Sequence, residues 1–286
     1  MTSMLLRLGP HTLDCTDRTA VMGILNVSDD SPITESIVDS GAALDRAIAL
    51  HRAGAEIIDV GAHSTASNAR ELTLQEEIER VAPAVEAIAL EGIPTSVDTW
   101  NVEVARAAAG AGVHLLNDVT AAADPAMGAL AAEFGLALCA MHMRGRPQRH
   151  NEVDQTYENV EAEVRRFLVE RAATLEAAGV PQVWLDPGFA FGKSEADNVR
   201  LLLGLPRLVE AGRPILISAS RKGFLGQLLG EGYGQRAPRI LEATIAFNVL
   251  AAWAGVHVVR VHDVAEVAAA IRIVNAARAR RAEDAG

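Results

Sequence analysis

The sequence predicts one (β/α)8 barrel, a TIM barrel spanning residues 1–286, with a short N-terminal β-hairpin closing its bottom. Three observations support this fold class. Eight short apolar segments are rich in β-forming residues, helical stretches separate them, and 286 residues suit one large core. Continuously apolar strands are typical of a parallel sheet covered by helices, and eight strand–helix units favour the closed barrel.

The predicted strands follow one another along the chain, after a hairpin that ends before residue 20. They are VMGILNV at 21–27, EIIDVG at 56–61, IPTSVD at 93–98, VHLLND at 113–118, LALCAMH at 136–142, QVWLD at 182–186, PILISAS at 214–220 and HVVRVHD at 257–263. Stretches such as 41–55 and 160–179 have helical periodicity, and a glycine before most strands indicates a helix C-cap. A doubly wound open sheet is the alternative, but no GxGxxG follows the first strand.

The composition limits the classes of partner. Hydrophobic residues make up 50% of the chain and the formal net charge is −11, which argues against non-specific binding of nucleic acid or of an anionic membrane. An anionic substrate would therefore need a local basic pocket. Cys15 and Cys139 are far apart and form no CxxC, so we expect reduced thiols in a cytoplasmic protein.

The sequence predicts neither a signal peptide nor a membrane-spanning helix. The N-terminal sequence MTSMLLRLGPHTLD has no basic segment followed by a long apolar stretch, so no signal peptide is expected. The longest nearly charge-free run, 243–259, contains polar residues and a glycine. It fits a buried helix, a glycine turn and a strand better than a membrane span.

Polar residues stand at nearly every predicted strand end. They are Asn26, Asp59 with Gly61, Asp98, Asn117 with Asp118, His142, Asp186, Ser220 with Arg221 and Lys222, and Arg260 with His262. Barrel enzymes place their chemistry at these carboxyl ends, where the loops converge on one mouth. A single buried aspartate would more often cap a helix, but the whole set indicates an active site.

Two groups with different chemistry can be distinguished. Asp98, Asn117 and Asp186 offer acceptors and an amide, which suit a planar heterocycle presenting N–H donors, as a pterin does. Arg221, Lys222, Arg260 and His262 follow the last two strands, where barrels often bind phosphate. We therefore expect acids on one side of the mouth and bases on the other. A solvated basic face is the alternative, less favoured because both motifs follow buried strands.

The sequence lacks the motifs of two other enzyme classes. The histidines show neither HxH nor HExxH spacing, so no zinc site is expected, and the absence of GxSxG disfavours a serine hydrolase.

A series of motifs runs in order from residue 21 to about residue 275: MGILNVSDDS, GAEIIDVGAHST, SVDTW, LLNDV, MHMRGRP, LDPGFAFGK, SRKGFLG and RVHDV. These motifs resemble those of the dihydropteroate synthase family, the pterin-binding barrels of folate synthesis. The resemblance implies that 4-aminobenzoate displaces pyrophosphate from 6-hydroxymethyl-7,8-dihydropterin diphosphate, with Mg2+ as cofactor. The related methyltetrahydrofolate-dependent methyltransferases share the Asp and Asn strand ends but not the SRK and RxH pair.

The resemblance also implies roles for individual residues. Asp98, Asn117, Asp186 and Lys222 would hold the pterin, with Met141 and Phe191 against its ring. Asn26 would help bind Mg2+ and the diphosphate together with Arg260 and His262, and Ser220 would lie near the aminobenzoate carboxylate. Thr65 and Arg221 complete the expected substrate-binding set. The expected catalytic residues are Asp98, Asp186, Lys222, Arg260 and His262.

The chain departs from the family pattern on the side of the acceptor. The first loop reads Ser28-Asp29-Asp30-Ser31-Pro32-Ile33-Thr34 without the usual Phe, and Ser64-Thr65 is followed by Ala66-Ser67-Asn68 instead of Arg-Pro-Gly. Ala190 and Ser218 replace two usual glycines. Three interpretations follow, in order of preference: a synthase with a remodelled aminobenzoate pocket, an enzyme using another nucleophile, and a non-catalytic pterin-binding paralogue.

The assembly is less constrained by the sequence. The family resemblance implies a homodimer formed through late helices, and the apolar segment 240–255 is a candidate contact. Burial in the core explains that segment equally well.

Overall fold

The computed structural model describes residues 3–27, 42–62, 72–147, 149, 152–234 and 237–285. Eight parallel strands form one sheet. They are β3 (Ala20–Asn26), β4 (Ile57–Gly61), β5 (Thr95–Asp98), β6 (Leu115–Asp118), β7 (Ala137–Met141), β8 (Val183–Asp186), β9 (Leu216–Ile217) and β10 (Val258–Val261). The predicted strands and their order are confirmed.

The sheet closes into a barrel. Its hydrogen-bonded order is β8-β7-β6-β5-β4-β3-β10-β9, and a parallel bridge between Leu185 and Ile215 joins the two outer strands. The seventh strand is shorter than predicted, because only Leu216 and Ile217 form ladder pairs with β10. Residues 218–220, which the sequence assigned to this strand, therefore belong to the loop at the mouth.

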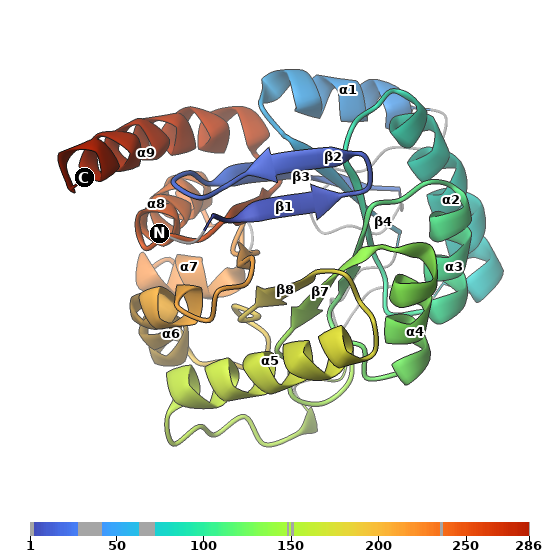
Figure 1. Ribbon diagram of the computed structural model, residues 1–286. Helices are drawn as coiled ribbons and strands as arrows, with labels where there is room; N and C mark the ends of the chain where they lie inside the picture. The colour runs from blue at the N-terminus through green and yellow to red at the C-terminus, as the bar shows by residue number, and fades with distance from the viewer. Residues whose placement is uncertain are drawn as a thin grey trace.

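Helices surround the barrel (Figure 1). They are α1 (Ala43–Ala53), α2 (Leu74–Leu90), α3 (Val102–Gly110), α4 (Pro125–Phe134), α5 (Val160–Ala177), α6 (Glu195–Val209), α7 (Gly223–Leu228), α8 (Ile240–Trp253) and α9 (Val264–Ala285). Several ends follow from local sequence. Thr73 and Ser194 form capping boxes with Glu76 and Asp197 at the starts of α2 and α6.

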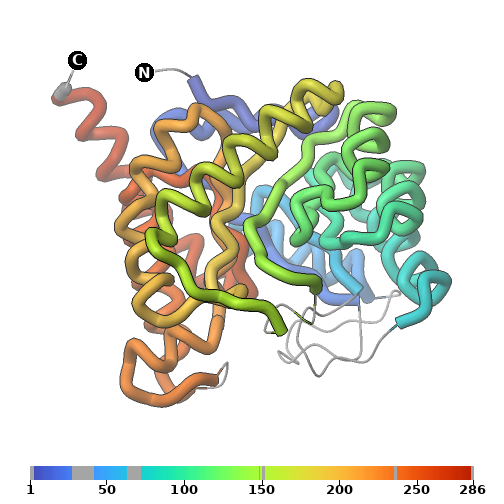
Figure 2. The backbone as a smooth tube through the Cα atoms, turned by 90° about the horizontal axis from the view of Figure 1, so that it is seen from below, coloured from blue at the N-terminus to red at the C-terminus, as the bar shows by residue number. Residues whose placement is uncertain are grey.

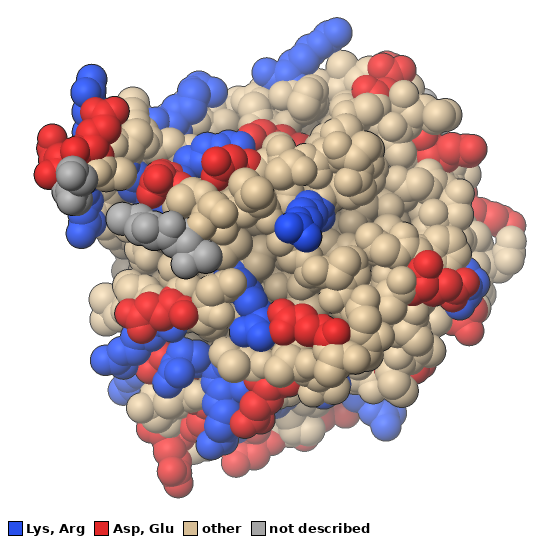
Figure 3. Space-filling model, viewed as in Figure 1, with Lys and Arg blue, Asp and Glu red and all other residues tan. Residues whose placement is uncertain are grey.

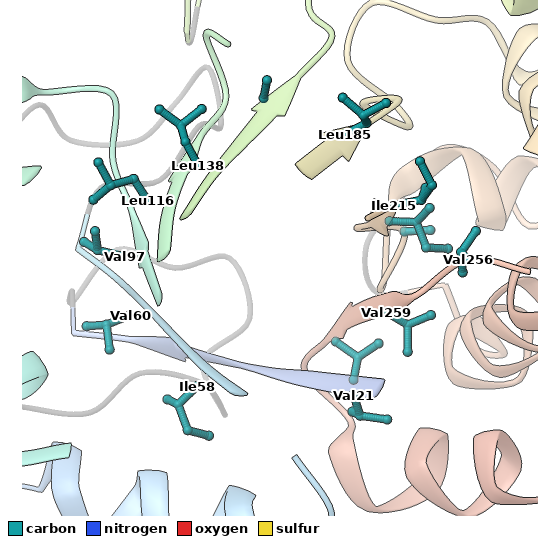
Figure 4. Packing of buried hydrophobic residues seen from close by; sticks show 14 of the residues in the cluster. Val21, Ile58, Val60, Val97, Leu116, Leu138, Leu185, Ile215, Val256 and Val259 are labelled. Carbon is teal, nitrogen blue, oxygen red and sulfur yellow. The ribbon is translucent and has the colours of Figure 1, made fainter. Parts of the chain in front are cut away.

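Alternation along each strand separates two apolar layers. Outward residues pack against the helices, as Val21, Ile58, Val60 and others do around the barrel in Figure 4. Inward residues form a second cluster inside the barrel, to which Met22, Ile57, Leu115, Cys139, Trp184, Leu216 and Val258 contribute.

The N-terminal hairpin closes one end of the barrel. Its strands β1 (Leu5–Leu8) and β2 (His11–Asp14) are antiparallel, and Leu6 and Leu8 are buried in the same cluster as the barrel interior. In Figure 2 the hairpin lies at one end of the molecule, while the segment between β7 and α5 crosses the opposite end. The hairpin thus covers the end of the barrel opposite the carboxyl ends of the strands, as predicted.

The remaining bulk features follow from the same fold. Cys15 and Cys139 are free and buried, and burial raises the pKa of the Cys15 thiol to about 12. Within the described residues, no helix is long and apolar enough to cross a membrane. The run 243–259 forms most of α8, a turn at Gly255 and the start of β10. On the face in Figure 3, basic and acidic atoms lie interspersed around a mostly uncharged centre.

Candidate active site

The inward-facing residues at the strand ends meet at the mouth. On β5 and β6, Asp98 lies opposite Asn117, and on β7 and β8, Met141 lies opposite Asp186. Asp59 on β4 stands two residues after Ile57, which lies in the interior cluster, so its side chain also faces inward. The alternation that buries apolar residues lower in the barrel thus brings acids and an amide together at its top.

Arg260 lies among these acids and not on the opposite side of the mouth. Its Nε donates to Asp59 Oδ2 at 2.5 Å and its Nη2 donates to Asp98 Oδ2 at 2.7 Å. Its Nη1 lies 3.5 Å from the hydroxyl of Ser218, one of the two positions where the family usually has glycine. The expected separation of acids from bases is wrong, because two buried carboxylates this close need a cation between them.

Asp59 is a site residue to which the sequence assigned no role. It is fully buried, and its Oδ2 also accepts a hydrogen bond from Asn117 Nδ2 at 3.2 Å. It therefore connects Arg260 to the amide expected to hold the substrate. The sequence contained one indication of this role, because Asp59 stands two residues after Ile57 in a buried strand. Its partners on β6 and β10 cannot be identified from the sequence.

Two oxygen atoms of this group lack partners among the described residues. Asp59 Oδ1 and Asp98 Oδ1 are buried and accept no hydrogen bond. An unsatisfied buried acceptor costs about 1–3 kcal/mol, so native proteins rarely keep one without a function. A ligand with N–H donors at the mouth would satisfy these atoms.

Burial shifts the protonation of the central groups towards their neutral forms. It raises the pKa of Asp98 to about 7, against the opposing charge of Arg260, and that of Asp186 to about 6. Burial, together with the charge of Arg260, lowers the pKa of Lys222 to about 8. These groups can change charge near neutral pH when a ligand alters their surroundings.

An apolar wall stands beside the charged group. Val119, Met141 and Phe191 form a small buried cluster, and Lys222 Nζ lies 4.4 Å from the centroid of the Phe191 ring, a cation–π distance. Trp100 and Met143 pack against the same cluster. The combination of a flat apolar wall with buried acceptors suits an aromatic ring whose edge carries hydrogen-bond donors.

The loop after β8 brings Asp186 and Phe191 together. Asp186 Oδ1 accepts from the Gly188 amide at 2.7 Å. Gly188 has φ +67°, and a Cβ there would lie 2.1 Å from the His142 carbonyl oxygen, so only glycine fits. Ala190 has φ +70° and separates Phe189, packed on Phe224 and Phe247 in the core, from Phe191 at the mouth.

Ser220, Arg221 and His262 form the other part of the site. The hydroxyl of Ser220 lies 3.0 Å from His262 Nδ1 and accepts from the His262 amide at 3.2 Å. Arg221 forms a bidentate ion pair with Asp263, at 2.9 and 2.6 Å. Burial, with the charges of Arg260 and Lys222, holds the pKa of His262 well below its usual range.

A cavity of about 310 Å³ opens beside these residues. It lies between α1 and the start of α9, and its lining includes Arg46, Leu50, Arg221, His262, Asp263 and Glu266. The expected phosphate-binding residues Arg221 and His262 thus share one hollow with a further arginine from α1.

Two strand-end residues face away from the mouth. Asp118 accepts hydrogen bonds from Thr120 and from the Ala122 amide, and thereby holds its own loop. The His142 ring packs against Phe167, with centroids 5.1 Å apart. The sequence placed both at strand ends, but each follows an inward residue and must point to the helix layer.

The comparisons with known proteins agree with this geometry. Residues 22–262 match the sequence model of the pterin binding enzyme family. The dihydropteroate synthase of Escherichia coli strain K12 is 42% identical over 263 residues, covering 90% of each chain. The chain belongs to the dihydropteroate synthase family. The synthase of Mycobacterium leprae is 40% identical over 262 residues, covering 90% of this chain and 92% of its own.

Solved structures of the dihydropteroate synthase family share the fold. The Thermus thermophilus enzyme in complex with 4-aminobenzoate superposes with a TM-score of 0.84 at 39% identity, covering 95% of this chain and 99% of its own. The Yersinia pestis enzyme in complex with a sulfonamide drug gives a TM-score of 0.88 at 38% identity, covering 96% and 100%.

Some expected positions of the synthase family lie outside the described residues. They are Thr65 and the two altered loop segments at 28–34 and 64–68. Asn26, the expected metal ligand, ends β3 opposite Gly61 in the register. A Cβ on Gly61 would lie 3.8 Å from Asn26 Oδ1 and 3.4 Å from Asp98 Cβ, so the glycine keeps space open between these two side chains.

Proposed function

We propose that this chain is a dihydropteroate synthase that joins 4-aminobenzoate to 6-hydroxymethyl-7,8-dihydropterin diphosphate and releases pyrophosphate. The observation that carries the proposal is the buried acceptor group beside the apolar wall: Asp98 Oδ1 has no partner among the described residues. A pterin ring carries N–H donors along its edge and a flat face. Asp98, Asn117 and Asp186 receive the edge, while Met141 and Phe191 cover the face.

The reaction forms one bond and breaks another at the exocyclic methylene. The amine nitrogen of 4-aminobenzoate bonds to the methylene carbon and loses a proton, while the C–O bond to the diphosphate breaks and pyrophosphate leaves. Cationic character develops on the methylene and the conjugated ring. Asp98 and Asp186 stabilise that charge when ionised, because they are fixed in a site of low dielectric constant. No covalent enzyme intermediate is required.

The diphosphate occupies the side of Arg260 and His262. Arg260 Nη1 has only the long contact to Ser218 among the described residues, so it can donate to a phosphate oxygen. His262 is neutral at pH 7 and donates from Nε2 when the Ser220 hydroxyl donates to Nδ1. The 310 Å³ cavity lined by Arg221, His262 and Arg46 receives the leaving group.

A magnesium ion fits beside this group. Mg2+ is commonly bound through one or two protein oxygens together with substrate phosphates, and no group of three or more His, Cys, Asp or Glu among the described residues could hold a metal alone. Asn26 would provide the amide oxygen in the space that Gly61 leaves. The ion would neutralise charge on the departing diphosphate.

The protein also forms a homodimer in this proposal, through α8 and α9. Leu250 and Trp253 lie one turn apart on α8 and are 55% and 48% exposed, and Ile273 on α9 is 73% exposed. The two helices pack against each other, so the three apolar side chains belong to adjoining surfaces.

The function is tested by measuring pyrophosphate release from the pterin diphosphate with Mg2+. Release that depends on 4-aminobenzoate is expected. Release without any amine, or only with a different amine, contradicts the proposed acceptor. Methyl transfer from methyltetrahydrofolate in the presence of a corrinoid protein would instead identify a methyltransferase.

Two variants test whether the active site lies at Asp98 and Lys222. Asp98→Asn removes the charge that stabilises the cationic ring, and we expect turnover to be abolished. Lys222→Ala removes one of the cations near Asp186 and the ammonium group over the Phe191 ring, and we expect weaker pterin binding. Glu133→Gln, in a surface ion pair with Arg106, is the control and keeps normal activity. If both site variants match this control, the active site lies elsewhere.

A further inference from the structure

The chain contains two lysines and 24 arginines. Both lysines, Lys193 and Lys222, lie at the mouth of the barrel, and Lys193 is only 8% exposed. Every other basic side chain except the histidines is an arginine. An arginine presents a broad planar fork, whereas an ammonium group is a compact point charge with three donors, so the two side chains are not interchangeable at a site with closely spaced acceptors.

The surroundings of Lys193 form such a site. Its Nζ donates to three backbone carbonyl oxygens: Gly188 at 2.8 Å, His142 at 3.2 Å and Phe191 at 3.2 Å. Three donors thus meet three acceptors. One carbonyl belongs to the loop after β7 and two belong to the loop after β8, so the ammonium group joins the two loops next to the backbone hydrogen bond from His142 to Asp186, at 2.9 Å.

The two lysines hold the same residue from different sides. Lys193 binds the backbone carbonyl of Phe191, and Lys222 lies over the Phe191 ring at 4.4 Å. Phe191 packs in turn on Met141. Asp186 is electrostatically coupled to both ammonium groups. Displacing Lys193 would therefore release the apolar wall and change the charge environment of Asp186 without removing a group that contacts the substrate.

We propose that Lys193 is a positioning residue for pterin recognition, whose ammonium group, bound by the carbonyls of His142, Gly188 and Phe191, fixes Phe191 beside Met141 and Lys222. This role rests on the proposed pterin-binding function. It assigns Lys193 to the pterin and not to the acceptor, because its three carbonyls belong to the loops that carry the pterin wall.

The test measures binding of a non-reactive probe, 6-hydroxymethylpterin, which lacks the diphosphate. Lys193→Met keeps an unbranched side chain that is one atom shorter and has no hydrogen-bond donors. We expect its Kd for the probe and its KM for the pterin diphosphate to rise at least tenfold, while the KM for 4-aminobenzoate stays within twofold. Asn275→Ala is the matched control: Asn275 makes two backbone hydrogen bonds to Thr19 at the other end of the barrel. It should lower Tm without changing the Kd.

The wild-type protein provides a second measurement that does not depend on folding of the variant. With ¹³C-labelled lysine, the protein gives two ε-carbon signals, which Lys222→Met assigns. Saturation with 6-hydroxymethylpterin should move the Lys193 signal as well as that of Lys222. An unmoved Lys193 signal, or a folded Lys193→Met protein with wild-type Kd, overturns the proposal. Failure of the wild-type protein to bind the probe would instead contradict the proposed function itself.

Discussion

At the scale of single residues, the site depends on the balance between three carboxylates and three cations. Asp59, Asp98 and Asp186 are buried close to Arg260, Lys193 and Lys222. Burial raises the pKa of the carboxyls of Asp98 and Asp186 and lowers that of both lysines, the pKa of Lys193 to about 7. Because the charged forms are needed to stabilise a cationic ring, activity is sensitive to pH near neutrality.

The pH profile tests this balance. Asp98, with a pKa of about 7, becomes protonated below neutrality, so kcat/KM should fall as the pH decreases through 7. The negative charge of Asp59 contributes to the raised pKa of Asp98. Asp59→Asn should therefore move the acid limb of kcat/KM to lower pH. An acid limb that stays in place or moves to higher pH would show that Asp59 does not influence Asp98.

Ala190 tests backbone strain at a position where the family usually has glycine. A φ of +70° destabilises the folded state by about 1–2 kcal/mol for a residue with a Cβ. Glycine avoids this strain, but its larger conformational entropy in the unfolded chain offsets part of the gain. Ala190→Gly should stabilise the protein by roughly 0.5–1 kcal/mol, which unfolding by urea would detect. Ala173→Gly, at an exposed position inside α5, should destabilise it by about 1 kcal/mol. Equal effects of both substitutions would exclude strain at Ala190.

At the scale of secondary-structure elements, neutral histidines fix two strand starts. His257 precedes β10 and accepts a hydrogen bond from the Ile215 amide through Nδ1 at 2.9 Å. His114 precedes β6 and accepts from the Thr95 amide in the same way, at 3.0 Å. Each ring must be unprotonated at Nδ1 to accept. Burial accordingly lowers the pKa of His257 to about 4 and also lowers that of His114.

Stability should therefore decrease in acid. His257 is unprotonated in the native state down to about pH 4, whereas the unfolded chain binds a proton below about pH 6.5. Its contribution is complete above pH 6.5 and is lost as the pH falls towards 4, by at most about 3 kcal/mol. His257→Asn keeps an acceptor that does not titrate. The free energy of unfolding of this variant should decrease less than that of the wild type between pH 7 and pH 4; parallel curves would contradict the assignment.

At the scale of the whole molecule, the closed barrel leaves one end for chemistry. The hairpin fills the other end with Leu6 and Leu8, and the proposed dimer contact is formed by exposed apolar side chains on α8 and α9. Leu250→Glu places a charge at the proposed dimer contact, so we expect a monomer by size-exclusion chromatography with light scattering. Leu90→Glu, at an exposed leucine on α2, should leave the mass unchanged. A wild-type protein that is monomeric at micromolar concentration would remove this proposal.

The sequence by itself determined the barrel, the order of its strands and most of the residues at its mouth. These depend on patterns that are local in the chain: apolar strands, helical periodicity and short motifs such as LDPGFAFGK. It did not determine which strand-end side chains face inward, since the exact bounds of each strand set the alternation. His142 and Asp118 accordingly point to the helix layer.

Only the tertiary structure decided which charges pair. Asp59 and Arg260 are 201 residues apart in the chain and form the shortest ion pair of the site, and the carbonyl oxygens around Lys193 come from two separate loops. The physical reason is that the residue pattern along one strand specifies which way its side chains point. The partner of a buried charge instead depends on which other strands the closed barrel places within about 3 Å of that charge.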